Sequence, residues 1–187
     1  MQVVAGSARR IQLKTLPGDR TRPTSNRIKE TLFNILQPLV QGTRFLDLFA
    51  GSGAIGIEAL SRGARKAVFV ENSREACAVI KENLAKTRLG EAAEVMLSDA
   101  SAALRRLSAK GEPFDIVFMD PPYDGGFERP ILAQLASSPI VTQETLIIVE
   151  ARARTQVEDL DGMGLELVRE KIYKNNKHLF IKRKEQS

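Results

Sequence analysis

The sequence predicts an α/β protein whose core is a doubly wound, mostly parallel seven-stranded sheet. From residue 44 onward, short apolar runs alternate with segments that have helical periodicity. Most of these apolar runs lack polar alternation, which is typical of strands that helices cover on both faces. The last two runs instead alternate apolar and polar residues, so they predict an antiparallel hairpin at the end of the sheet.

The predicted elements follow one another in a regular order. Strands are expected over residues 44–49, 66–71, 93–99, 114–120 and 144–150. Helices are expected between them, over residues 52–63, 73–90, 101–109 and 127–137. Ser73 is a suitable N-cap for the second of these helices, and Gly90 is a suitable stop. Strands that alternate with helices in this way are typical of a parallel sheet.

The C-terminal segment breaks this rhythm. "GLELVREKIYK" (164–174) and "KHLFIKRK" (177–184) alternate apolar and polar residues on either side of Asn175-Asn176. A short turn between two alternating runs predicts an antiparallel hairpin. This ending differs from that of a dinucleotide-binding fold, whose sixth strand arrives through another helix.

Residues 1–38 are expected to form a separate N-terminal extension. The runs "MQVVAG" and "RRIQLKTL" predict two short strands around Gly6-Ser7. The run "TSNRIKETLFNIL" (24–36) predicts an amphipathic helix that opens at Pro23 and Thr24. We therefore divide the chain into this extension, a small hairpin and a helix, and a main domain of residues 39–187.

The composition is that of an ordinary soluble globular protein, with 43% hydrophobic and 27% charged residues. No run of about 18 apolar residues is present, and no apolar signal core precedes Arg9 and Arg10. We therefore expect a cytoplasmic protein without a membrane segment, and we expect a monomer. Cys77 and His178 are the only cysteine and the only histidine, so neither an internal disulfide nor a metal site is expected.

Positive charge is concentrated near the N-terminus. Residues 1–29 contain seven Arg or Lys residues and one Asp, a net charge of +6 in a chain whose total is +5. A basic arm on a near-neutral body is the electrostatic pattern expected for binding a polyanion such as nucleic acid. Solubilising charge on a flexible end would give the same pattern. The candidate nucleic-acid-binding residues are Arg9, Arg10, Lys14, Arg22 and Arg27.

A glycine-rich loop joins the first predicted strand of the sheet to its helix. "DLFAGSGAIG" (47–56) places Gly51, Gly53 and Gly56 in a GxGxxG spacing, and Glu71 ends the next strand. A carboxylate at that distance suits the ribose hydroxyls of a nucleoside ligand. The glycines alone would equally serve a tight turn without a ligand. A dinucleotide and S-adenosylmethionine both fit this pattern.

Asp47 favours S-adenosylmethionine over a dinucleotide. Its carboxylate is expected near the floor of the ligand crevice, where it would repel a pyrophosphate by about 1 to 4 kcal/mol at a separation of roughly 4 Å. The same charge attracts the sulfonium and α-ammonium groups of S-adenosylmethionine. No Lys-Ser or Lys-Thr pair follows the glycines, which excludes a phosphate-binding P-loop. Asp99, at the end of the third strand, suits an adenine amino group and would also serve as the N-cap of the next helix.

The run "MDPPYDGG" (119–126) closes the fourth predicted strand. The carboxyl ends of the strands form the ligand crevice of an open α/β sheet, so Asp120 is expected at the same rim as the other carboxylates. Two successive prolines fix a rigid turn whose carbonyl groups face the crevice. Asp120 and the Pro121 carbonyl then form a pair of acceptors for an exocyclic amino group. Tyr123 offers a face on which a nucleobase can stack.

With these motifs, the chain resembles the class I S-adenosylmethionine-dependent methyltransferases that methylate amino groups. More narrowly, it resembles the bacterial family that methylates guanine N2 in small-subunit (16S) ribosomal RNA. The matching stretches are "VVAGSARRIQLKT", "RPTSNRIKETLFNIL", "FLDLFAGSGAIGIEALSRGA", "VFVE" and "DPPY". The resemblance covers nearly the whole chain. It implies a Rossmann-like fold, S-adenosylhomocysteine as a product, and ribosomal RNA or the assembling small ribosomal subunit as partner.

The resemblance also implies roles for individual residues. Asp47, Gly51 and Gly53 would line the methionine part of the cofactor. Glu71 would bind the ribose, Asp99 the adenine, and the Asp120–Tyr123 turn the guanine amino group. The full expected cofactor set is Asp47, Ala50, Gly51, Ser52, Gly53, Glu71, Asn72, Asp99 and Ala100. The expected catalytic set is Asp120, Pro121, Pro122 and Tyr123, and the basic residues of the arm would hold RNA.

Two positions are notable against the family pattern. The family often has glycine where Arg10 stands in the first hairpin, which leaves the shape of that turn or its RNA contact in question. The aromatic residue of the DPP motif varies between Phe and Tyr, so the Tyr123 hydroxyl is expected to be dispensable.

Other functions remain open from the residues alone. The same motifs would serve adenine N6 in DNA or RNA, although no segment is long enough for a DNA target-recognition insertion. They would also serve a protein glutamine amide, which typically comes with Asn in place of Asp120. A non-catalytic RNA-binding assembly factor would keep the basic arm without needing Asp120. A nicotinamide oxidoreductase is disfavoured by Asp47, by the DPPY turn and by the terminal hairpin.

Overall fold

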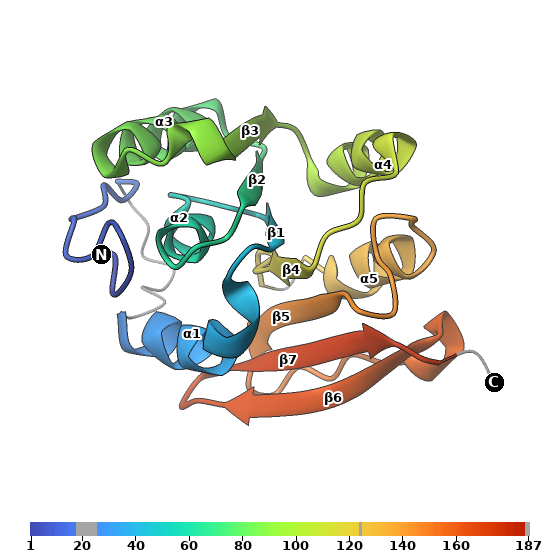
Figure 1. The fold of residues 1–187 in the computed structure, drawn as a ribbon. Coiled ribbons are helices and arrows are strands. Elements are labelled where there is room, and N and C mark those ends of the chain that lie inside the picture. Colours follow the sequence, from blue (N-terminus) through green and yellow to red (C-terminus); the bar gives the residue numbers. More distant parts are fainter. Residues whose placement is uncertain (18–25, 124, 186–187) are drawn as a thin grey trace.

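The computed structural model describes residues 1–17, 26–123 and 125–185. Its core is one seven-stranded sheet with the strand order β3-β2-β1-β4-β5-β7-β6 (Figure 1). The strands are β1 (Arg44–Leu48), β2 (Lys66–Glu71), β3 (Ala93–Leu97), β4 (Ile116–Met119), β5 (Leu146–Arg152), β6 (Leu165–Ile172) and β7 (Asn176–Arg183). The first five strands are parallel, and β7 is antiparallel to both β5 and β6. The predicted fold class is therefore confirmed.

Helices cover both faces of the sheet. The α-helices are α1 (Asn26–Val40), α2 (Ala54–Ser61), α3 (Arg74–Thr87), α4 (Ala100–Lys110) and α5 (Glu128–Ala136), and 3-10 turns lie at Gly90–Ala92 and Asp161–Met163. The first three helices lie on one side of the sheet, and α4 and α5 lie on the other (Figure 1). Successive residues of one strand therefore enter different cores: Phe118 packs in the core under α1 to α3, and Val117 in the core under α4 and α5.

The strand order places a ligand crevice at the carboxyl ends of the parallel strands. From β1 the chain proceeds outward through β2 to β3 and then crosses back to add β4 on the other side of β1. The loops that follow β1 and β4 thus leave the sheet toward opposite faces. Ligands of open α/β sheets bind at such a switch point, outside the carboxyl ends of the strands. The loops after β1 and β4 are the glycine-rich loop and the DPPY turn.

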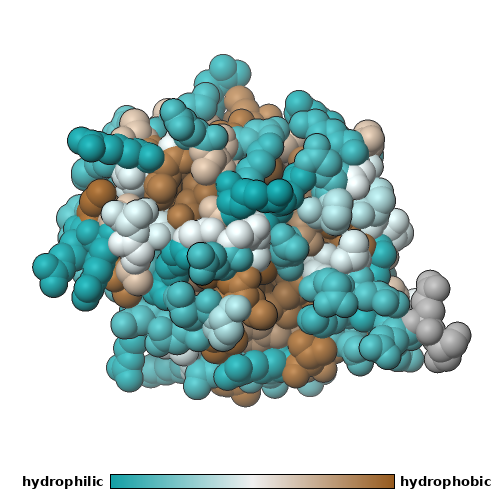
Figure 2. Space-filling model, in the orientation of Figure 1, coloured by the Kyte–Doolittle hydropathy of each residue, from teal (hydrophilic) through white to brown (hydrophobic). Residues whose placement is uncertain are grey.

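The C-terminal hairpin forms the edge of the sheet beyond β5. Its outer strand, β6, buries only Leu165, while Leu167, Val168 and Ile172 are 46%, 48% and 59% exposed. A register shift between Leu167 and Arg169 interrupts the pairing with β7. Figure 2 shows mostly polar residues along this lower edge, with apolar residues between them. Bulges and charged side chains are features that discourage an edge strand from pairing with another chain.

The N-terminal segment forms less hairpin than predicted. A single bridge joins Gln2 to Gln12, and the Val3 amide donates to the Ile11 carbonyl at 3.0 Å. Other amides of the segment bond to α2 instead of crossing to a second strand. The Ser7 amide donates to the Ser61 carbonyl at 2.8 Å, and the Ala8 amide to the Ser61 hydroxyl at 2.9 Å. A Cβ at Gly6 would collide with the Ser61 carbonyl, so this close approach requires glycine.

A buried ionic cluster fastens the N-terminal segment and α1 to α2. Glu58, fully buried in α2, accepts hydrogen bonds from the amides of Val4 at 3.0 Å and Ala5 at 3.1 Å. Its oxygens also lie 3.1 Å from the Lys29 Nζ and 2.9 Å from the Arg62 Nε. Lys29 is fully buried too, and its ammonium donates to the Gln2 carbonyl. Burial lowers the pKa of Lys29, and the Glu58 carboxylate opposes that shift.

The extension and the main sheet share one hydrophobic core. Leu13 of the N-terminal segment and Phe33 of α1 belong to the same cluster as Phe45 of β1. The helix α1 also continues to Val40, four residues beyond its predicted end and through Pro38. Leu36 and Val40 are both fully buried, so packing holds the last turn in helical form. The division at residue 38 stays a prediction.

Candidate active site

A cavity of about 1370 Å³ opens at the carboxyl ends of the parallel strands. Residues of the loops after β1, β2, β3 and β4 line it, together with Arg152 at the end of β5. Its rim also includes residues from the N-terminal part of the chain, namely Met1, Thr15, Leu16 and Asn26. The glycine loop, three carboxylates and the DPPY turn therefore meet in one cavity.

The glycine loop makes a tight turn between β1 and α2. Gly51 and Gly53 have positive φ angles of 57° and 81°, a conformation that glycine adopts readily. Gly56 packs so closely on the Phe69 ring that a Cβ there would collide with it. Phe49 is unusual, because it has a φ of 62° without being glycine. A bulky residue in the left-handed region stores of order 1 to 3 kcal/mol of strain, and such residues cluster at functional sites.

Asp47 lies at the floor of the cavity, on β1. It is 1% exposed, and its Oδ2 accepts a hydrogen bond from the Gly56 amide at 3.0 Å. Burial raises the pKa of Asp47 to about 7, while the Gly56 amide opposes the shift and Glu71 adds to it. A buried carboxylate that is costly to ionise is suited to a positively charged ligand, which would lower its pKa toward the ordinary value.

Glu71 ties two loops together at the end of β2. Its Oε2 accepts from the Gly51 amide at 2.8 Å, and its Oε1 accepts from the Ser73 amide at 2.9 Å. An ionised carboxylate has about four lone-pair sites, so each oxygen retains capacity for a further donor such as a ribose hydroxyl. Glu71 thus both shapes the glycine loop and lines the cavity.

Asp99 has the position expected at the end of β3. Its Oδ1 accepts from the Ala102 amide at 2.9 Å and so caps α4. The residue also lines the cavity beside Ala100. The structure therefore confirms Asp99 as the N-cap of α4, and its role toward adenine stays a prediction.

The DPPY turn faces the three carboxylates from the end of β4. Asp120, Pro121, Pro122 and Tyr123 all line the cavity. The guanidinium of Arg152 lies over the Tyr123 ring, with Cζ 4.6 Å from the centroid. Phe49 and Phe127, whose rings are 5.8 Å apart, add apolar wall nearby. Aromatic rings and a guanidinium therefore line the cavity together with the DPPY turn.

The structure brings together nearly all of the predicted site. Of the expected cofactor residues, Gly53 alone does not line the cavity; it is buried beneath the loop, against Ile80 and Phe69. The other expected cofactor residues line it: Asp47, Ala50, Gly51, Ser52, Glu71, Asn72, Asp99 and Ala100. The roles assigned to these residues stay predictions.

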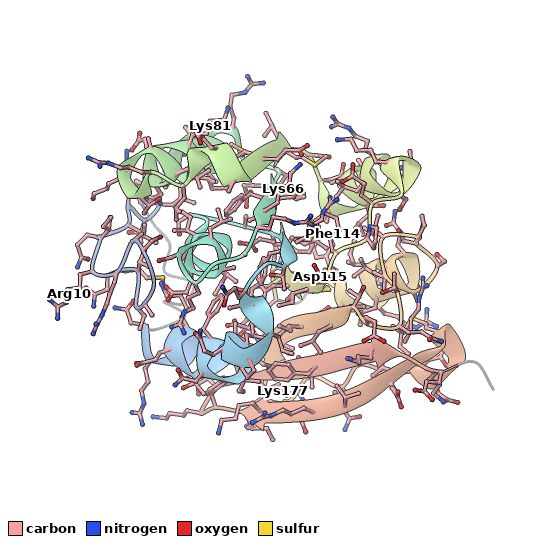
Figure 3. All side chains as sticks on the ribbon, viewed as in Figure 1. Arg10, Lys66, Lys81, Phe114, Asp115 and Lys177 are labelled. Carbon is pink, nitrogen blue, oxygen red and sulfur yellow. The ribbon has the colours of Figure 1, made fainter. Side chains whose placement is uncertain are left out.

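The candidate RNA-binding residues lie apart from this cavity. Arg9, Arg10, Lys14 and Arg27 are exposed, and none of them lines it, whereas Arg22 falls outside the described residues. Lys14 pairs with Glu82 at 2.8 Å on the surface of α3. Arg10 points away from the protein (Figure 3), and its φ of 70° explains why a family pattern would favour glycine at this turn.

Sequence reasoning missed several residues of the cavity. Arg152 lies two residues past the predicted end of its strand, and β5 is long enough to carry it to the rim. Thr15 and Leu16 belong to the arm, which was assigned to nucleic acid alone. Phe49 stands inside the glycine motif, where a large residue amid small ones was the available signal.

The described residues contain neither a metal-ligand cluster nor a membrane-spanning helix. Over residues 1–17, 26–123 and 125–185, no three His, Cys, Asp or Glu side chains gather as they would around a metal ion. In the same part of the chain, no helix has both the length and the apolar character that a bilayer crossing needs.

The fold is that of the class I, Rossmann-like methyltransferases. A solved S-adenosylmethionine-dependent methyltransferase from Agrobacterium tumefaciens aligns with a TM-score of 0.63 at 16% identity, covering 88% of this chain and 63% of that one. At this identity the likeness shows the fold alone. A solved Escherichia coli structure aligns with a TM-score of 0.84 at 35% identity, over 100% of this chain and 99% of that one.

The family model described as conserved hypothetical protein 95 matches residues 1–182. Ribosomal RNA small subunit methyltransferase D of Escherichia coli (strain K12) is 36% identical over 172 residues, 92% of this chain and 84% of the relative. The protein of the same name from Haemophilus influenzae is 33% identical over 150 residues, 80% and 78% of the two chains. The chain therefore belongs to the family of ribosomal RNA small subunit methyltransferase D.

Proposed function

We propose that this protein transfers a methyl group from S-adenosylmethionine to the exocyclic N2 amino group of a guanine in small-subunit ribosomal RNA. The observation that carries the proposal is the meeting of the DPPY turn with Asp47, Glu71 and Asp99 in one cavity. The relatives named as small-subunit rRNA methyltransferases support the substrate class. The guanine assignment rests on the family resemblance, since the DPPY turn would serve adenine nearly as well.

The cofactor's chemistry fits the side chains of the inner cavity. S-adenosylmethionine supplies a methyl group on a positively charged sulfonium. Asp47, buried and with a raised pKa, would face its cationic methionine part. Glu71 would accept from the ribose hydroxyls and Asp99 from the adenine amino group, each with an oxygen that already orders a neighbouring backbone amide.

The DPPY turn would prepare the target amine. The lone pair of an exocyclic amine on a nucleobase is delocalised into the ring, so the amine is a poor nucleophile. Asp120 and the Pro121 carbonyl would hold its two hydrogens and favour the pyramidal form, whose lone pair points at the methyl carbon. Alignment needs only acceptor oxygens, so we assign Asp120 to alignment first and to proton removal second.

The target guanine would be presented from an unpaired or flipped position, which costs a few kcal/mol if the base must unstack. Stacking on Tyr123 would return roughly 1 to 3 kcal/mol. The exposed cations of the N-terminal segment and of α1 would contact phosphates, which position the RNA without reading its sequence.

The proposal is tested by methyl transfer from labelled S-adenosylmethionine to small-subunit RNA or particles from cells that lack this protein. We expect the label in N2-methylguanine. Label in N6-methyladenine would overturn the target base, and absence of label despite cofactor binding would overturn the RNA substrate. Failure to bind S-adenosylmethionine would overturn the reaction class.

Two substitutions at Asp120 test its role in the same assay. Asp120→Ala removes both acceptor oxygens, so turnover should fall at least about 100-fold while cofactor affinity stays within about threefold. Asp120→Asn retains one acceptor oxygen and cannot act as a base. Residual turnover well above the alanine variant supports alignment, whereas equal loss in both supports a base. A matching loss of cofactor affinity would contradict either role.

A further inference from the structure

A second hollow, of about 410 Å³, lies between the start of α1 and the turn that joins β6 to β7. In Figure 1 the beginning of α1 lies above this turn. Arg27, Ile28 and Thr31 line it from the helix, and residues 171–174 line it from the hairpin. We call this hollow the hairpin groove.

The hairpin groove is basic. Arg27, Lys171 and Lys174 line it and are exposed, and among the described residues no carboxylate lines it. The nearest acid along β6, Glu170, already pairs with Lys177 of β7 at 2.8 Å. Three cations around one hollow favour a ligand with several negative charges.

Tyr173 gives the groove a fixed aromatic wall. Its hydroxyl lies 3.1 Å from the Nδ1 of His178, and the two rings meet edge to face at 5.1 Å. The His178 Nε2 in turn lies 2.9 Å from Glu150, and both of these residues are fully buried. Burial raises the pKa of Tyr173 to about 12, so the phenol remains neutral at physiological pH. Ile172, 59% exposed, adds an apolar surface beside it.

Neighbouring residues at the start of α1 line the hairpin groove and the active-site cavity. Asn26 lines the large cavity, and the next two residues of α1 line the hairpin groove. The first turn of α1 therefore separates the two hollows. An RNA chain bound in the cavity would therefore have the groove close by, across one turn of α1.

We propose that the hairpin groove binds a single-stranded segment of the substrate rRNA next to the target nucleotide. Arg27, Lys171 and Lys174 contact its phosphates, and a base packs on Tyr173 and Ile172. Cations along a backbone path with an aromatic platform are the usual means of binding single-stranded nucleic acid. The inference rests on the proposed function and assigns part of RNA binding to the C-terminal hairpin.

The test compares two double variants with the same change of charge. The first variant combines Lys171→Glu with Lys174→Glu and reverses the charge of these two groove residues. Lys86→Glu with Arg106→Glu changes exposed residues in the C-terminal halves of α3 and α4, away from both hollows. Binding to small-subunit rRNA is measured from 0.05 to 0.3 M salt, alongside S-adenosylmethionine affinity and methyl transfer.

We expect the groove variant to lose rRNA affinity about tenfold or more at 0.1 M salt and to lower the salt slope by about 1 to 1.5. Its cofactor affinity should match wild type, and the control should stay within about threefold in RNA binding. Equal losses of rRNA affinity in the groove variant and the control variant would overturn the groove as an RNA-binding site. A loss on whole particles but not on naked rRNA would also overturn it and point to a protein contact. If the wild type itself neither binds nor methylates rRNA, the proposed function fails instead.

Discussion

At the scale of single residues, Asp47 links the active site to pH. Its carboxylate is buried, and this burial raises its pKa to about 7. A ligand with sulfonium and ammonium charges prefers the ionised form, so binding it below pH 7 must release a proton. Proton release opposes binding more strongly as the pH falls.

We therefore predict that the affinity for S-adenosylmethionine decreases as the pH falls from about 7 to 5.5, approaching tenfold per pH unit. Asp47→Asn should bind weakly with a nearly flat profile over this range, because the amide does not titrate and its oxygen can still accept from the Gly56 amide. Calorimetric titration at several pH values measures the cofactor affinity of the wild type and of the variant. A flat profile in the wild type would contradict the assignment of Asp47 to the cationic part of the ligand.

The backbone angle of Arg10 allows effects on stability to be distinguished from effects on RNA binding. It adopts a φ of 70°, which costs about 1 kcal/mol or more for a residue with a Cβ. Arg10→Gly should therefore leave the protein equally stable or more stable by up to about 1 kcal/mol. Arg9→Gly removes the same charge at a residue without positive φ, and it should destabilise by about 0.5 to 1 kcal/mol.

Urea unfolding measures this stability difference between the two arginine variants. Both variants should weaken rRNA binding and reduce its salt slope by about 1 if these side chains contact phosphates. Unchanged salt dependence in both would show that the exposed arginines serve another role.

At the scale of elements, the short helix α2 connects two other parts of the chain, the N-terminal segment and α1. Glu58 accepts hydrogen bonds from two backbone amides and forms ion pairs with an ammonium and a guanidinium. The N-terminal segment, α1 and α2 meet at this side chain. Removal of one partner from a buried ion pair leaves an uncompensated charge. This carboxylate therefore adds an ionic attachment of the arm to its bonds with Ser61 and to the burial of Leu13.

We predict that Glu58→Gln lowers the free energy of unfolding by about 3 to 5 kcal/mol, because Lys29 would remain buried and charged. Glu82→Gln breaks an ion pair of similar length, but its side chains are 55% and 57% exposed, so it should cost less than about 1 kcal/mol. Chemical denaturation of both variants gives the comparison. A cost below about 1 kcal/mol for Glu58→Gln would mean that Lys29 loses its proton or regains water.

Periodicity was sufficient to predict the main elements but not their ends. Apolar runs and caps gave the order and type of every strand and helix of the sheet. The expected strand 114–120 is shorter, as β4, because the Phe114 and Asp115 amides bond to Ile140 and Arg44 outside the regular ladder. The N-terminal hairpin is reduced because its amides bond to α2. Glu58 was visible as a lone acid in an apolar helix, but its partners 29 or more positions away were not.

At the scale of the whole molecule, the geometry of parallel sheets was sufficient to predict where most of the site residues lie. The loops that follow parallel strands share an edge, so motifs far apart in sequence were expected to meet, and they do. Local motifs could not predict contributions from the other parts of the chain. The arm reaches the rim through Thr15 and Leu16, and the hairpin supplies Tyr173 and two lysines to a second hollow. Such contacts depend on tertiary packing rather than on local pattern.

The helix α2 contacts both the active-site cavity and the segments beside the hairpin groove. Ala54 and Ile55 at its start line the active-site cavity, and Glu58 one turn later bonds to both the arm and α1, which begins between the two hollows. Thermodynamic linkage is reciprocal: if an occupied cavity changes RNA affinity by some factor, bound RNA must change cofactor affinity by the same factor. The order in which the two substrates arrive would then leave the stability of the ternary complex unchanged, and it would alter only the route by which that complex assembles.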